Sequence, residues 1–392
     1  MSRTLLATLA LMSACSPTVP ADKSTARTAG DTSDTVDTPD TDDTDDTDEP
    51  EDTDDTDSAD TAPPEDTGPI DTGDPEEPAP ITAFECFSHQ LPDDGIAPVD
   101  YDAWSPVMGS HCKSTNHQDI VGVERVVFVG DSITVGTPPT RTNYFYRNLV
   151  ADDMVARFGL EEPSNQWRNA NVVEGVSGEQ TSGDFASCAK WGARTDDIAR
   201  EPHEQLQTCI PEEERDKVHL VVMTVGGNDL FAWAQDLVDG VDPAVVWVEV
   251  EEAVADLEAA VAWLRDDPAR FPAGVHIVFA NNFAFTDVDA AHDLSTCPGA
   301  DLIGMDVGLV DPDFMAMATW MQGEMMRIAV QHEADMVFMG EHTCGHGHNK
   351  DNPDGRCYRG ASTDLWFDLT CMHPNADGHA GIADLFVAAV DE

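Results

Sequence analysis

The residues of this chain that could do chemistry lie at three widely separated places. A short apolar run ends in Gly130-Asp131-Ser132, a glycine-rich stretch contains Asn228, and His373 lies near the C-terminus. A serine hydroxyl becomes a good nucleophile when a histidine accepts its proton. An asparagine amide can donate a hydrogen bond to the negative oxygen that forms when a carbonyl is attacked. These residue types predict a hydrolase with a serine nucleophile.

A scaffold must bring these residues together, and the apolar pattern predicts a parallel sheet. Short apolar runs predict strands at 125–129, 169–174, 218–225, 274–281 and 335–339. Helix-like stretches lie near 140–158, 187–200, 243–266, 312–333 and 376–390. This alternation favours an α/β fold with three layers, α/β/α, around a parallel, roughly five-stranded sheet. Ser132 and Asn228 both follow predicted strands, so we expect them at the same edge of the sheet.

The motifs resemble, as a set and in their order, those of the SGNH hydrolases, also called the GDSL esterase and lipase superfamily. Four blocks carry the resemblance: Gly130-Asp131-Ser132-Ile133, Ser177-Gly178-Glu179-Gln180-Thr181, Gly226-Gly227-Asn228-Asp229 and His373-Pro374-Asn375. The resemblance covers roughly residues 120–392. It implies the flavodoxin-like SGNH hydrolase fold and the hydrolysis of carboxylic esters without a cofactor or a metal.

The resemblance also implies a role for each site residue. Ser132 is expected to attack the ester carbonyl, and His373 is expected to act as its general base. The backbone amides of Ser132 and Gly178 and the side chain of Asn228 are expected to form the oxyanion hole. Asp131 and Asp229 are expected to be hydrogen-bonding turn residues rather than catalytic acids.

One position departs from the family's pattern. The family usually places an aspartate three residues before the histidine, where this chain has Thr370, whereas Asp368 lies five residues before His373. Asp368 could orient His373 through a remodelled turn, held by a disulfide at Cys371. Alternatively, a backbone carbonyl orients His373 and the enzyme uses a Ser–His dyad. Of the two, we favour the catalytic role of Asp368.

The N-terminal 80 residues predict export and a tether. Residues 1–15 resemble a lipoprotein signal peptide that ends at a lipidated Cys15, and the competing interpretation is an ordinary secretory signal. Residues 16–80 are rich in Asp, Thr and Pro, and they predict a disordered acidic linker before the catalytic domain, 81–392. We therefore expect an exported protein that is lipid-anchored at the cell envelope, in the outer membrane, or else extracellular.

Eight cysteines remain once Cys15 is assigned to lipid, and an even number in an exported chain suggests disulfides. Proximity in sequence favours the pairs Cys86–Cys112 and Cys188–Cys209 and leaves the other four cysteines open. Cys344 lies among His342, His346 and His348, so a zinc site is the competing interpretation there. A loop held by a disulfide is the favoured one.

The net charge is −56, which excludes nucleic acid as a partner because no cluster of basic residues could bind phosphates. We expect a monomer that hydrolyses a small-molecule, lipid or carbohydrate ester, with both the acyl and alcohol groups left open. The acidity is consistent with a salty habitat. The alternative function is a surface-binding protein on a hydrolase scaffold that has lost catalysis, a hypothesis motivated by the missing aspartate.

Overall fold

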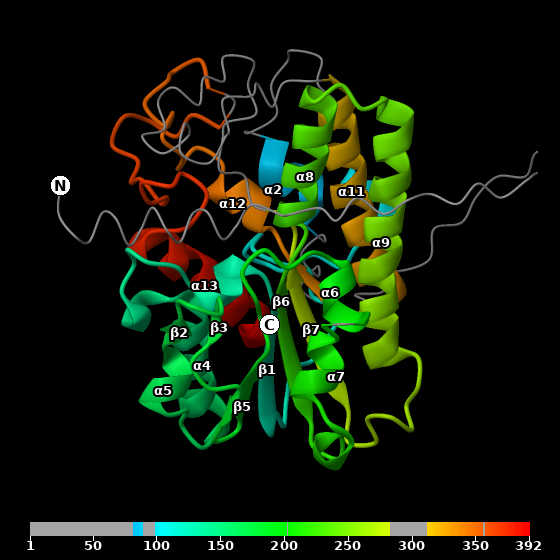
Figure 1. The fold of residues 1–392 in the computed structure, drawn as a ribbon, viewed down its shortest axis with the longest axis vertical. Coiled ribbons are helices and arrows are strands. Elements are labelled where there is room, and N and C mark those ends of the chain that lie inside the picture. The colour runs from blue at the N-terminus through cyan, green and yellow to red at the C-terminus, as the bar shows by residue number, and fades with distance from the viewer. Residues whose placement is uncertain (1–80, 89–98, 202, 283–311, 356) are drawn as a thin grey trace, which may run out of the picture. The chain divides into compact units, whose positions relative to one another are not determined.

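A six-stranded sheet lies at the centre of the structure, in the order β4-β5-β1-β6-β7-β8 (Figure 1). The computed structural model describes residues 81–88, 99–201, 203–282, 312–355 and 357–392, so Cys15, the 16–80 linker and Cys297 lie outside the described residues. The strands are β1 Arg125–Gly130, β4 Thr181–Ser182, β5 Phe185–Ser187, β6 His219–Thr224, β7 Val275–Ala280 and β8 Asp335–Val337. Five of them run parallel, as predicted, and β4 pairs antiparallel with β5 at the edge.

One predicted strand is wrong. Residues 169–174 do not enter the central sheet, because β2 Ala170–Asn171 pairs only with β3 Val176–Ser177 in a separate two-stranded sheet. Val173 is 90% exposed, so the β-branched residues of this segment do not pack into the core. The strand beside β1 is β5, in which Phe185 and Ala186 are fully buried.

Helices cover both faces of the sheet and complete the three predicted layers (Figure 1). The longer helices are α4 Tyr146–Phe158, α8 Gly227–Val238, α9 Pro243–Arg265, α11 Pro312–Gln331 and α13 Ala376–Asp391. The shorter ones are α2 Ala83–Phe87, α3 Ser132–Val135, α5 Asn165–Arg168, α6 Asp196–Ala199, α7 Gln205–Cys209 and α12 Met339–Thr343. The predicted helix 187–200 is therefore mostly wrong, since α6 alone is helical in it.

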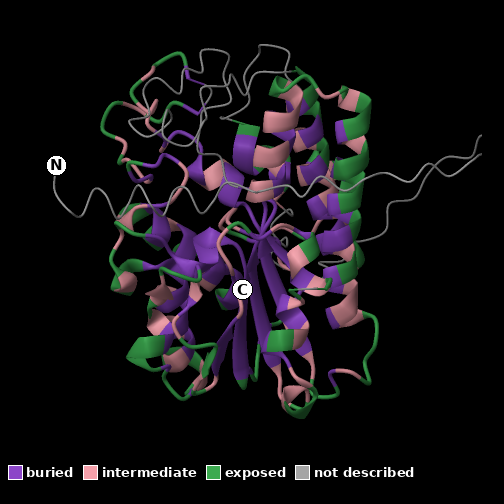
Figure 2. Cartoon of the chain, in the orientation of Figure 1, coloured by how far each residue is buried: buried purple, intermediate pink, exposed green. Residues whose placement is uncertain are grey.

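The two cores follow from the alternation of side chains along the strands. Val127 of β1 and its neighbour Val221 of β6 pack against α9 and α11, whereas Phe128 and Val222 pack against α4 and α13. All residues of β1 and β6 are buried, as a parallel sheet covered on both faces requires (Figure 2).

Disulfides close three loops in the described residues. The predicted pairs Cys86–Cys112 and Cys188–Cys209 are confirmed, and the third bond is Cys344–Cys357. The sulfur of Cys344 is therefore not available as a zinc ligand. Cys371 is disulfide-bonded as well.

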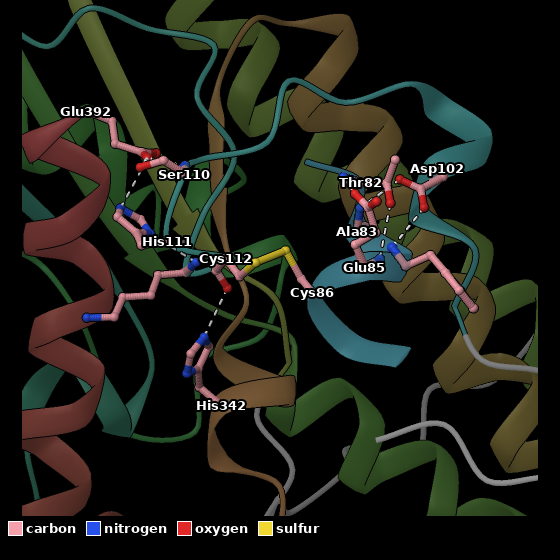
Figure 3. Close-up of a disulfide and its surroundings, with 12 residues drawn as sticks. Thr82, Ala83, Glu85, Cys86, Asp102, Ser110, His111, Cys112, His342 and Glu392 are labelled. Atoms are coloured by element: carbon pink, nitrogen blue, oxygen red, sulfur yellow. Dashed lines mark hydrogen bonds and ion pairs between the residues drawn. A yellow bond between two sulfur atoms is a disulfide. The ribbon is translucent and has the colours of Figure 1, made fainter. Parts of the chain in front are cut away.

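Figure 3 shows how the first disulfide attaches α2 to the body of the unit. Cys86 of α2 is bonded to Cys112, and the carbonyl of Cys112 lies 3.1 Å from Nε2 of His342 on α12. Thr82 caps α2 by accepting a hydrogen bond from the amide of Glu85. The first described segment is thus held by a covalent bond and by its own helix cap. Among the described residues, no helix is long and apolar enough to cross a membrane.

Candidate active site

Ser132 lies at the carboxyl end of β1, and Gly130 sets its position. Gly130 has a φ of +128°, and a Cβ there would lie 1.9 Å from the carbonyl oxygen of Thr224 on β6. Only glycine permits this close approach of the two strand ends. The amide of Asp131 donates to the same Thr224 oxygen at 3.1 Å, so the chain leaves the sheet in a fixed direction.

Asp131 is a turn residue, as predicted. Its side chain caps α3 by accepting hydrogen bonds from the amide of Ile133 at 2.9 Å and from the hydroxyl of Thr224 at 3.1 Å. Burial raises the pKa of Asp131 to about 7. Ser132 is the first residue of α3, and within the described chain its backbone amide donates to no acceptor.

The structure brings His373 to Ser132, although the two residues are 241 positions apart. Nε2 of His373 lies 3.0 Å from Oγ of Ser132, the contact a general base needs. Burial lowers the pKa of His373 to about 4, so the imidazole is neutral and able to accept a proton near pH 7.

A short hairpin delivers His373 from the chain before α13. Phe367 and Pro374 form an antiparallel bridge, and the amide of Asp368 donates to the carbonyl of His373 at 2.9 Å. Asn375 then caps α13, since its side chain accepts from the amides of residues 377 and 378. The position of His373 is therefore fixed by the hairpin on one side and by the N-terminus of α13 on the other.

Asn228 lies at the start of α8, directly after β6, as predicted. Its side-chain nitrogen donates to the carbonyl of Ala193 at 2.8 Å and retains a second hydrogen. The buried side chain of Asp229 accepts from the amide of Thr195 at 3.2 Å and from its hydroxyl at 3.3 Å. Neighbouring residues of α8 thus hold the loop that follows β5, and Asp229 is a structural residue as expected.

Comparison with known proteins agrees with this arrangement. The sequence model of the GDSL-like lipase/acylhydrolase family matches residues 128–380, which include Ser132, Asn228 and His373. The chain belongs to the GDSL-like lipase/acylhydrolase family. Its chemistry is the hydrolysis of ester bonds.

Solved structures with a similar fold include two enzymes with low sequence identity. An extracellular lipase from Streptomyces rimosus is 18% identical, with 68% of this chain and 100% of that chain covered at a TM-score of 0.39. An acetylxylan esterase from Geobacillus stearothermophilus is 15% identical, with 70% and 97% covered at a TM-score of 0.37. No curated protein sequence matches the chain.

The predicted oxyanion-hole role of Gly178 in this GDSL-like hydrolase is not met by the structure. Its backbone amide donates to the carbonyl of Asn169 at 2.7 Å, so it is occupied within the β2–β3 sheet. Ser177 beside it is also structural, since its hydroxyl donates to Ser187 at 2.7 Å. The prediction rested on the resemblance of Ser177-Gly178 to the family's second block, but this segment belongs to the β2–β3 hairpin and not to the loop after a strand of the central sheet.

The loop that does adjoin Asn228 is 188–195, which follows β5. It contains Gly192, with a φ of +77°, and open space surrounds the position where a Cβ would lie. No acceptor for the Gly192 amide is found in the part of the chain that the structure describes. Sequence reasoning missed this residue, and the available signal was the short Phe185-Ala186-Ser187 run before it.

Neither predicted way of orienting His373 is found directly. Nδ1 of His373 lies 3.2 Å from the hydroxyl of Thr370, and that hydroxyl contacts Oδ1 of Asp368. Asp368 is therefore close to the site but reaches the imidazole through Thr370. Its carboxyl group is buried, and this burial raises its pKa to about 6.

Three further histidines of the C-terminal region make contacts within the fold. Nε2 of His348 lies 2.9 Å from the carbonyl oxygen of Asp368, and the ring of His346 stacks on Trp366 at 3.7 Å between centroids. His379 is buried, and its Nδ1 accepts from the amide of Tyr146 at 3.2 Å. Within the described ranges, no group of three or more His, Cys, Asp or Glu residues could hold a metal ion.

A cavity of about 420 Å³ lies beside the hairpin that carries His373. Phe367 and Asp368 of the hairpin line it together with Arg141 and Tyr144, and neither Ser132 nor His373 reaches it. The cavity is therefore separate from the reacting atoms.

Proposed function

We propose that this chain is an esterase that cleaves carboxylic esters through an acyl-enzyme on Ser132, while a lipid on Cys15 tethers it to the cell envelope. The observation that carries the catalytic part is the 3.0 Å contact between Nε2 of His373 and Oγ of Ser132 at the carboxyl edge of the sheet. The contact joins a nucleophile to a neutral base whose lowered pKa keeps it unprotonated.

The reaction then follows from these two residues. Oγ of Ser132 attacks the ester carbonyl as its proton moves to Nε2 of His373, and His373 returns this proton to the leaving alcohol. The acyl group remains on Ser132 until water, activated by the same histidine, attacks it. Both half-reactions pass through a tetrahedral intermediate with a negative oxygen.

We propose three hydrogen-bond donors for that oxygen. We assign them to the amide of Ser132, the second hydrogen of the Asn228 side chain and the amide of Gly192. The first turn of α8 adds its positive end to the same region. Removing one such donor typically lowers kcat by about 10²- to 10³-fold, so we expect a loss of this size in Asn228→Ala with the fold intact.

The catalytic proposal is tested with p-nitrophenyl esters from acetate to long acyl chains. The oxidised wild-type protein is expected to release p-nitrophenol, and Ser132→Ala is expected to lose this turnover while keeping the same thermal unfolding profile. The chain length that gives the highest kcat/KM identifies the acyl preference. Equal turnover in wild type and Ser132→Ala would contradict the proposal.

The tether is supported by the lipobox-like residues before Cys15 and by the acidic 16–80 linker. Two or more acyl chains on Cys15 are enough for stable membrane anchoring. In cells, we expect the wild-type protein in the membrane fraction and Cys15→Ser in a soluble fraction. Recovery of the wild type from the soluble fraction, without lipid on Cys15, would exclude the anchor.

A further inference from the structure

Thr370 occupies the position at which an acid is expected, three residues before His373. Its hydroxyl lies 3.2 Å from Nδ1 of His373 and also contacts Oδ1 of Asp368. Together with the 3.0 Å contact from His373 to Ser132, these bonds form one continuous chain of four side chains.

The direction of each hydrogen bond in this chain is fixed by chemistry. Nε2 of His373 must offer a lone pair to the hydroxyl of Ser132, so the proton of the neutral imidazole resides on Nδ1. Nδ1–H can then donate only to an acceptor, which is the oxygen of Thr370. The hydroxyl proton of Thr370 is left to point at Asp368, because an ionised carboxylate has no proton to donate.

The turn from 368 to 373 holds Thr370 in this place. The amide of Thr370 donates to Oδ1 of Asp368 at 2.8 Å, and the amide of Cys371 donates to the carbonyl of Asp368 at 3.0 Å. Cys371 adopts a φ of +61°, which reverses the chain before His373. The amide of His373 also donates to the hydroxyl oxygen of Thr370, at 3.3 Å. The same oxygen of Thr370 therefore contacts both the backbone and the ring of His373.

The carboxyl group of Asp368 has few polar contacts besides those with Thr370. Asp368 is 7% exposed, and within the described residues Oδ2 is buried without a hydrogen-bond partner. No Arg or Lys of the described chain forms an ion pair with it at 4.0 Å or less. Burial raises its pKa to about 6, so the group is mostly ionised at pH 7 to 8. The carboxyl group of Asp368 is thus connected to His373 through the hydroxyl of Thr370.

We propose that Thr370 is a positioning residue that links His373 to Asp368, so that Ser132, His373, Thr370 and Asp368 act as a relayed triad. This inference rests on the proposed esterase function. The hydroxyl of Thr370 fixes the tautomer and the ring orientation of His373. When His373 takes the proton of Ser132, the Thr370 dipole and the carboxylate of Asp368 stabilise the imidazolium, and no proton leaves Nδ1.

A fluorophosphonate probe tests the relay without knowledge of the natural substrate. In this reaction Oγ of Ser132 forms a bond to phosphorus, fluoride leaves, and the proton of Ser132 moves to Nε2 of His373. The labelling rate therefore reports how well His373 acts as a base. It is measured on the full chain for wild type, Thr370→Val, Thr370→Ser, Asp368→Asn and the Thr370→Val/Asp368→Asn double variant.

The relay predicts a distinct pattern of rates. Thr370→Val keeps the shape of the side chain but lacks the hydroxyl, so labelling should slow by about 10²-fold, within the range for general-base catalysis. Thr370→Ser keeps the hydroxyl and should label at nearly the wild-type rate. The double variant should be no slower than Thr370→Val alone, because Asp368 acts only through Thr370.

A second measurement is independent of reactivity. In the nitrogen NMR spectrum, wild type and Thr370→Ser should show a protonated, hydrogen-bonded Nδ1 on His373, and Thr370→Val should lose this signature. Equal labelling of wild type and Thr370→Val, or fully additive losses in the double variant, would overturn the relay alone. Absence of labelling in the folded wild type would contradict the esterase function and the relay together. If Thr370→Val fails to fold, a slow Thr370→Ser would overturn the relay.

Discussion

At the scale of single residues, the sequence was sufficient to select the residues for which we propose the roles of nucleophile, base and one oxyanion donor. Ser132, Asn228 and His373 each follow or precede a regular element whose position depends on local pattern, so their positions could be predicted. The role that we propose for Thr370 could not be predicted in this way. It depends on a turn with a positive φ at Cys371 and on hydrogen bonds that no spacing rule specifies.

The pKa values of His373 and Asp368 predict the pH dependence of kcat/KM. Burial lowers the pKa of His373 to about 4, so the base is neutral above that pH and activity is lost as pH falls through it. Burial raises the pKa of Asp368 to about 6, so its charge, and part of the rate, is lost as pH falls through 6. A stopped-flow pH series should therefore show a partial decrease near 6 and a complete loss near 4.

Asp368→Asn provides the control for this assignment. It should remove the step near pH 6 and retain the one near pH 4. If kcat/KM of this variant instead fell in a single step near the ordinary histidine pKa of about 6.5, burial would not control the pKa of His373.

At the scale of elements, the alternation of strands and helices predicted the parallel sheet and its three layers. The pattern did not predict β5, because a strand of three buried residues followed by an irregular loop is too short to stand out. It predicted a strand at 169–174 instead, because Val172 and Val173 are β-branched although both are exposed. Because β5 is missed, the sequence gives no reason to consider Gly192 in the loop after it, whereas the resemblance to the family's second block favours Gly178. The identity of the strand beside β1 is a long-range property of the fold.

The Cys188–Cys209 disulfide holds the loop after β5, which contains Gly192, the donor proposed above, and contacts Asn228. Its cysteines are 21 residues apart, so replacing both with alanine should lower the free energy of unfolding by about 3 kcal/mol. It should also lower kcat, because the loop would no longer hold its donor in place.

The matched control is the double alanine variant of Cys86 and Cys112, which are 26 residues apart and join segments without catalytic residues. Its loss of stability should be similar, measured by urea unfolding, but its kcat should stay near that of wild type. Equal losses of kcat in the two double variants would show that the loop after β5 has no special role.

At the scale of the whole molecule, charge is the dominant feature. The chain has 76 acidic and 20 basic residues, and the acidic excess extends beyond the 16–80 linker into the catalytic domain. Like charges at this density repel one another in the folded state, and salt screens that repulsion.

Salt should therefore stabilise the protein. We expect the free energy of unfolding, measured with urea, to rise as NaCl increases from about 0.05 M to 1 M, where the screening length falls below 10 Å. Ser132→Ala should respond identically, since it leaves the charge unchanged. A free energy that stays constant over this range would contradict the interpretation of the acidity as an adaptation to salt.

The measurement that tests the central claim most directly is the capture of the acyl-enzyme. The protein is mixed with a p-nitrophenyl ester, quenched in acid within milliseconds, digested and analysed by mass spectrometry. We predict one acyl group on the peptide that contains Ser132, and none on that peptide from Ser132→Ala. Steady turnover of the ester with the acyl group on another residue, or on none, would contradict the account.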